Sequence, residues 1–154
     1  MAEGRQVPEI DAAQYAALVA GASDEELERG LTENRELLLG EIFKRMPERF
    51  DAAKAGDLDA VIEWRIGGRP DGRDDRWQLT IRNGTCTLTP DGEEEPTVSL
   101  RVGPVDFLKL ITGNASGPML FTFGKLKIRG DLLLAARIQS FFKIPRSRVP
   151  GDPR

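Results

Sequence analysis

The stretch that decides the fold is GKLKIRGDLLLAARIQSFF, residues 124–142. Its first half alternates apolar and basic residues, with Leu126 and Ile128 on one face, which predicts a β-strand. Asp131 suits the N-cap of a helix over residues 132–143. This helix is apolar almost all round, so we expect it to be buried on more than one side or to face something apolar that is not protein.

A second apolar segment, VDFLKLITGNASGPMLFTF, precedes this motif at residues 105–123. Pro104 suits the first position of a helix and Gly113 suits its end. A loop rich in small residues then leads into MLFTF, residues 119–123. This is more apolar surface than one face of a small sheet is expected to cover.

Four segments further upstream alternate apolar and polar residues with period two, at residues 58–66, 76–82, 85–90 and 97–102. Asn83-Gly84 between the second and third is a strong signal for a tight hairpin. One apolar and one polar face are typical of an antiparallel sheet with helices on one side and water on the other.

The N-terminal third is predicted to be helical. Ser23 and Glu26 have the spacing of a capping box, which predicts a short helix over residues 24–30. A separate amphipathic helix is predicted over residues 33–50, with Pro47 disturbing its last turn.

The motif GKLKIRGD, beginning at Gly124, resembles the C-terminal motif of the sterol carrier (lipid-transfer) family, a strand followed by a Gly-Asp turn and an apolar helix. The resemblance covers residues 32–144. It implies an α+β domain, a five-stranded mainly antiparallel sheet with one face covered by helices and an apolar tunnel between sheet and helices. It also implies binding of sterols, fatty acids, acyl-CoAs or other long-chain lipids. The chain departs from the family pattern in an extra segment over residues 1–31, in the absence of a peroxisomal tail, and in the small residues of 113–118.

From this resemblance we expect three parts: a partly helical extension at 1–31, a lipid-binding domain at 32–145 and a disordered tail at 146–154. Opening of the segment 113–123 would admit the ligand. The residues expected to line the tunnel are the inward-phased apolar side chains Leu39, Phe43, Trp64, Trp77, Leu79, Leu100, Phe107, Leu108, Ile111, Met119, Leu120, Phe123, Leu132, Leu133, Ala136 and Phe141.

The composition argues against chemistry. The chain contains no histidine, which excludes imidazole metal sites and histidine-based catalytic triads. We therefore expect no catalytic residue, no metal and no cofactor. The net charge of −3 argues against nucleic acid as a partner. Cys86 is the single cysteine, and we expect it to be an inert core thiol. No secretion signal is visible, so we expect a cytoplasmic protein. The preference for Arg over Lys indicates a GC-rich bacterial source.

Other interpretations of the same apolar and basic residues remain open. The apolar side chains can simply pack together, or the last helix can form a dimer interface, so both monomer and homodimer are compatible. A structural module with a self-filled cavity and a non-catalytic subunit of a lipid-metabolising enzyme are the alternative functions. The basic row Lys125, Lys127 and Arg129, together with Arg146 and Arg148, suggests transient contact with an anionic membrane.

Overall fold

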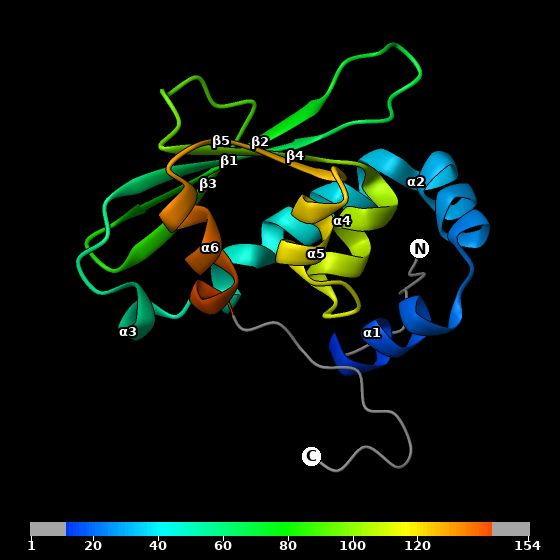
Figure 1. The fold of residues 1–154 in the computed structure, drawn as a ribbon, viewed down its shortest axis with the longest axis horizontal. Coiled ribbons are helices and arrows are strands. Elements are labelled where there is room, and N and C mark those ends of the chain that lie inside the picture. Colours follow the sequence, from blue (N-terminus) through cyan, green and yellow to red (C-terminus); the bar gives the residue numbers. More distant parts are fainter. Residues whose placement is uncertain (1–11, 143–154) are drawn as a thin grey trace, which may run out of the picture.

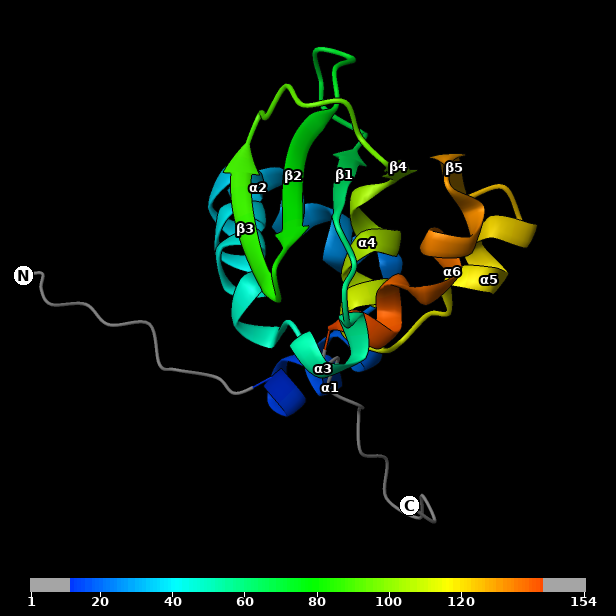
Figure 2. The ribbon, with the colours of Figure 1, turned by 90° about the vertical axis from the view of Figure 1, so that its left-hand side faces the viewer.

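Five strands form one sheet in the order β3-β2-β1-β4-β5 (Figure 2). The structure is a computed structural model, which describes the backbone of residues 12–142 and the side chains of residues 17–142. The strands are β1 (Ala60–Ile66), β2 (Asp75–Arg82), β3 (Thr85–Pro90), β4 (Val98–Val102) and β5 (Leu126–Gly130). Every neighbouring pair is antiparallel except β1 and β4, which run parallel. The predicted five-stranded, mainly antiparallel α+β sheet is confirmed, and the parallel pair at its centre makes it mixed.

The tight hairpin predicted between the second and third strands is present. Asn83 and Gly84 both adopt positive φ, 52° and 75°, as a type I′ turn requires. The turn fixes the register of β2 against β3, so that Leu79 faces Leu88 and Ile81 faces Cys86 on the inner side. Local turn chemistry thereby aligns the apolar residues of the two strands.

The helices gather on one face of the sheet (Figure 1). They are α1 (Ala12–Gly21), α2 (Asp24–Arg45), the 3₁₀ helix η1 (Met46–Arg49), α3 (Ala52–Ala55), α4 (Pro104–Ile111), α5 (Gly117–Thr122) and α6 (Leu132–Phe141). The predicted tail at 146–154 lies outside the described residues. The segment MLFTF, for which the sequence indicated only apolar character, forms most of α5.

Helix α2 corrects the prediction of two separate N-terminal helices. The capping box between Ser23 and Glu26 is present, with both reciprocal hydrogen bonds. The helix then continues past Gly30 and Thr32 and kinks at Asn34, whose φ of −134° and ψ of 33° are non-helical. Glycine and threonine lower helix propensity by less than about 1 kcal/mol each, so they do not end a helix that packs on a sheet.

Arg35, one residue after the kink, ties α2 to the sheet. Its Nε donates to Asp75 Oδ2 at 2.8 Å, and its Nη2 donates to the carbonyls of Ile66 and Gly67 at 2.8 and 2.7 Å. The side chain is only 15% exposed, so these bonds are partly shielded from water. They hold the helix across the ends of β1 and β2.

Gly130 in the GKLKIRGD motif is required by the backbone. Its φ is +97°, and a Cβ at this position would lie 2.5 Å from the carbonyl oxygen of Thr97 and 3.2 Å from the Cα of Val98. A glycine therefore allows β5 to end directly against β4, and Asp131 then begins α6 by accepting from the backbone N–H of Leu134.

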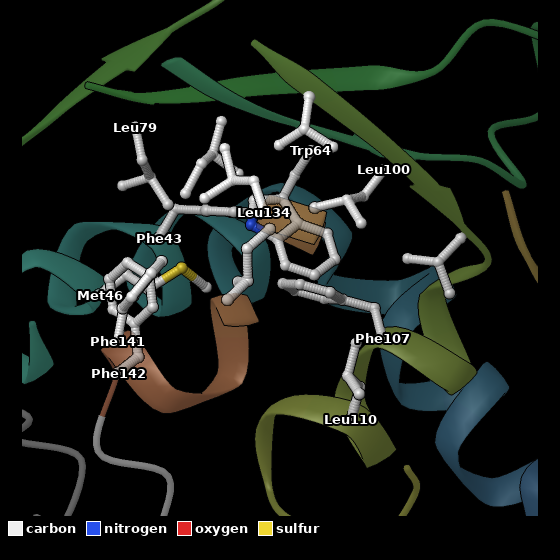
Figure 3. Packing of buried hydrophobic residues seen from close by; sticks show 14 of the residues in the cluster. Phe43, Met46, Trp64, Leu79, Leu100, Phe107, Leu110, Leu134, Phe141 and Phe142 are labelled. Atoms are coloured by element: carbon white, nitrogen blue, oxygen red, sulfur yellow. The ribbon is translucent and has the colours of Figure 1, made fainter. Parts of the chain in front are cut away.

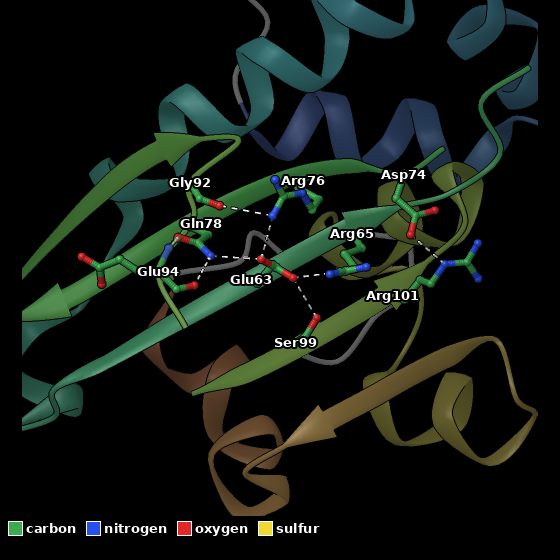
Figure 4. Close-up of polar contacts among 9 residues, drawn as sticks. All are labelled: Glu63, Arg65, Asp74, Arg76, Gln78, Gly92, Glu94, Ser99 and Arg101. Carbon is green, nitrogen blue, oxygen red and sulfur yellow. Dashed lines mark hydrogen bonds and ion pairs between the residues drawn. The ribbon is translucent and has the colours of Figure 1, made fainter. Parts of the chain in front are cut away.

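The outer face of the sheet is not simply hydrated, as the sequence pattern had suggested. Glu63 and Gln78 are buried there beneath the loop over residues 91–97 (Figure 4), 2% and 1% exposed. The Gln78 amide accepts from the backbone N–H of Glu94 and donates to the carbonyl of Glu94. The central strands are thus covered on both sides.

The carboxylate of Glu63 is surrounded by donors (Figure 4). It accepts from Arg65 Nε at 2.8 Å, from Gln78 Nε2 at 3.0 Å and from Ser99 Oγ at 3.3 Å, with Arg76 Nη1 at 3.6 Å. Burial alone would raise the pKa of Glu63, but the hydrogen bonds from Arg65, Gln78 and Ser99 and the charge of Arg65 outweigh it, so its pKa lies below the ordinary glutamate range.

We predict that Glu63→Gln lowers the free energy of unfolding at pH 7 by about 1–2 kcal/mol, because it removes the charge that its donors surround. The effect stays modest because Arg65 is 43% exposed. The pKa of Glu63 is lower in the folded protein than the value of about 4.3 in the unfolded chain, so its ionised form stabilises the fold above that pH. This stabilisation is lost as the pH falls below about 4.3 toward the folded-state pKa. Urea unfolding at pH 7 and pH 3.5 should therefore show the gap between variant and wild type narrowing in acid.

Glu94→Gln is the matched control, because Glu94 contributes only an exposed ion pair with Arg82 through its side chain. Such pairs contribute less than about 1 kcal/mol, so this variant should match the wild type at both pH values. Equal stability of Glu63→Gln and Glu94→Gln would contradict the role assigned to the buried carboxylate.

Candidate functional site

The interface between helices and sheet is organised by four aromatic rings. Phe43 of α2 stacks on Trp77 of β2, with ring centroids 4.7 Å apart, and on Phe107 of α4 at 5.1 Å. Phe107 in turn meets Trp64 of β1 edge-on at 5.3 Å (Figure 3). Because Trp64 and Trp77 are directly paired across β1 and β2, the rings fix both helices over the middle of the sheet.

Helix α6 covers the same face of the sheet over β4 and β5. Leu134, Ile138 and Phe141 are its buried residues, at the i, i+4, i+7 spacing of one helix face. The backbone N–H of Asp51 donates to the carbonyl of Phe141 at 2.7 Å, and Phe142 forms an isolated bridge with Phe50. Its C-terminal end is thus hydrogen-bonded to the segment that follows η1.

Helix α5 is attached more weakly. Leu120 is its buried residue, and it joins the core cluster. The side chains of Met119 and Phe121 on either side are 54% and 49% exposed. One buried leucine therefore anchors α5, which belongs to the segment 113–123 predicted to open.

Most of the predicted lining residues reach the interior. The buried ones are Leu39, Phe43, Trp64, Leu79, Leu100, Phe107, Leu108, Leu120 and Phe141. Trp77 and Ile111 are half-buried and pack against the core cluster. Leu108 is buried outside that cluster, whereas its neighbour Leu110, which the prediction omitted, belongs to it.

Five predicted lining residues are exposed and do not face the sheet. They are Met119, Phe123, Leu132, Leu133 and Ala136. On α6 the reason is helical phase, since Leu134 and Ile138 take the inner positions that the prediction gave to Leu132, Leu133 and Ala136. Counting back from Phe141 by three and four would have found them. Whether any of these sixteen side chains contacts a lipid stays a prediction.

Cys86 is half-buried on the inner side of β3. Burial raises the pKa of its thiol to about 11, so almost none of it is thiolate at neutral pH. Among the described residues, no three His, Cys, Asp or Glu side chains are grouped to hold a metal ion. None of the described helices has the length and apolarity that a membrane span requires.

Comparison with known proteins matches residues 39–143 to the SCP-2 sterol transfer family. Rat sterol carrier protein 2 is 27% identical over 104 residues, which are 68% of this chain and 19% of the rat protein. The oleate-induced peroxisomal protein POX18 of Candida maltosa is 32% identical over 108 residues, 66% of this chain and 84% of that protein. This chain thus spans less than a fifth of the rat protein.

The fold is also found among solved structures. Palmitated SCP2L2 from Aedes aegypti superposes with a TM-score of 0.52 at 19% identity, covering 68% of this chain and 94% of that one. The family match includes β1 to β5, α4 to α6 and the C-terminal end of α2 with Phe43, which together build the helix–sheet interface. The chain therefore belongs to the SCP-2 sterol transfer family.

Proposed function

We propose that this protein binds a long-chain lipid non-covalently between the helices and the inner face of the sheet, and transfers it between membranes in the cytoplasm without chemical change. The observation that carries the proposal is an apolar interface whose cover includes a segment held by one side chain, Leu120 of α5. Family membership supports lipid binding in general, and the SCP2L2 neighbour is described as palmitated.

The energetics suit reversible binding. Each buried methylene contributes about 0.8 kcal/mol, so an acyl chain supplies enough affinity even after the cost of ordering it. Exposing Leu120 costs about 1.5–3 kcal/mol, so an open form would be populated at roughly the per cent level. Ligand entry beside α5 then needs no unfolding of the sheet.

A carrier role fits the chemistry of the described residues. Cys86 is protonated and half-buried, and Glu63 lies on the outer face of the sheet, away from the helices (Figure 4). Neither meets the nucleophile–base geometry that catalysis requires. We infer that any chemistry on the lipid is performed by another protein.

A membrane contact is proposed at the corner formed by α5, β5 and α6 (Figure 2). Five large apolar side chains are exposed there, and Leu133 is the most exposed at 81%. The others are Met119, Phe121, Phe123 and Leu132. Lys127 and Arg129 are exposed on the adjoining edge strand β5, and Lys125 is exposed just before it. In a chain of net charge −3, apolar side chains beside a local basic row favour an anionic bilayer as the occupant.

We predict that the purified protein retains a long-chain lipid in native mass spectrometry and that added lipid saturably displaces a fluorescent acyl probe. Leu134→Asn, which places an amide in the helix–sheet interface, should weaken probe binding about tenfold because the amide loses its hydration. Leu133→Asn is the control and should leave probe binding unchanged, because the Leu133 side chain is 81% exposed.

Folding of both variants is checked by circular dichroism. No co-purified lipid and no saturable binding by wild-type protein across several lipid classes would refute lipid binding. A densely packed interior with a stable dimer through α6 would then favour the structural alternative.

We predict that the protein sediments with vesicles containing phosphatidylglycerol and not with pure phosphatidylcholine vesicles. Lys127→Gln combined with Arg129→Gln should weaken this binding at least about tenfold, at about 1 kcal/mol for each basic residue. Phe121→Ser with Phe123→Ser should weaken it as well, by removing the apolar contact.

Leu37→Ser is the matched control, because Leu37 is likewise a large apolar side chain, 66% exposed, but lies on α2, away from this corner. Unchanged vesicle binding in both corner variants would contradict the membrane contact. So would a dimer that forms through Leu132 and Leu133 and persists in the presence of vesicles.

A further inference from the structure

The aromatic interior contains two hydrogen-bond donors without a partner. The indole Nε1 atoms of Trp64 and Trp77 are buried, and neither has a hydrogen-bond acceptor among the residues that the structure describes. The Trp64 side chain is 5% exposed, so its N–H cannot be satisfied at the surface. Buried indole N–H groups in proteins usually find an acceptor, which makes two unpaired donors in one core unusual.

The surroundings of the two indoles are apolar. Trp64 and Phe107 form an edge-on ring pair (Figure 3). Trp77 stacks on Phe43. The buried polar side chains of the described chain are Glu63, Gln78 and Thr112. The first two lie on the outer face of the sheet, and the Thr112 hydroxyl donates to the carbonyl of Leu108. The interior therefore offers donors but no buried cation.

We propose that the Trp64 and Trp77 indoles donate hydrogen bonds to an oxygen of the bound lipid, which enters with its polar end toward the aromatic core. This rests on the proposed function and narrows its ligand. The acceptor is neutral, a hydroxyl or carbonyl oxygen, because an ionised carboxylate would be buried there without a counter-charge. The ligand class is thus long-chain alcohols and esters, in preference to hydrocarbons and ionised fatty acids.

The chain provides its own reporter, because Trp64 and Trp77 are its two tryptophans. Protein labelled with ¹⁵N-tryptophan gives two indole N–H signals, assigned with Trp64→Phe and Trp77→Phe. Oleyl alcohol should move the indole proton signals downfield, as a new hydrogen bond does. The C18 hydrocarbon 1-octadecene, and oleate at pH 8, should bind without that shift. An equal shift with 1-octadecene, or with oleate, would overturn the proposal.

Affinities give the second readout. Trp64→Phe should reduce the ratio of oleyl alcohol affinity to 1-octadecene affinity about tenfold, the loss expected for one buried hydrogen bond. Phe142→Leu is the control, because it removes buried aromatic area without removing a donor, so the ratio should stay the same. A merely structural role of Trp64 would lower both affinities together and leave the ratio unchanged, which would contradict the proposal.

The two failures are distinguishable. If wild-type protein binds none of the three probes, lipid binding itself fails. If it binds all of them with unshifted indole signals, lipid binding stands and the indole contact is wrong.

Discussion

The rings of Trp77, Phe43, Phe107 and Trp64 follow one another through the interior and fasten α2 and α4 to the middle of the sheet. Such ring pairs contribute about 0.5–1.5 kcal/mol each beyond their buried area. Arg35 adds hydrogen bonds from α2 to the adjacent ends of β1 and β2. This half of the cover is therefore firmly held. We propose that a ligand enters at the other half, over β4 and β5, which α5 and α6 cover.

The strands and their turns could be predicted because they depend on local pattern. Period-two alternation located the first four strands, and Asn83-Gly84 fixed the hairpin. The parallel pairing of β1 with β4 could not be, since it joins segments more than thirty residues apart in the chain. Likewise, the sequence gives no sign that the loop over residues 91–97 folds back over Glu63 and Gln78 and buries them.

The inward-facing side chains were predicted well on the sheet and on α2 and α4, where each side chain's phase was clear. On α5 and α6 only Leu120 and Phe141 of the predicted side chains are buried, because a segment apolar on every side does not reveal which side is inward. Leu134 and Ile138 took the interior, and Leu132 and Leu133 were left outside. The apolar side chains of α5 and α6 that were expected in the core are instead exposed. They form the proposed membrane contact, beside the proposed entrance for the ligand.

The central claim is that a lipid lies between the helices and the inner face of the sheet. The most direct measurement is the set of intermolecular nuclear Overhauser effects from a ¹³C-labelled long-chain alcohol bound to the protein. We predict contacts from the labelled chain to Leu79 and Leu100 of the sheet and to Leu134 of α6, all buried in the structure. Contacts confined to the exposed Phe121, Phe123 and Leu133 would contradict the claim, because the lipid would then only coat the surface.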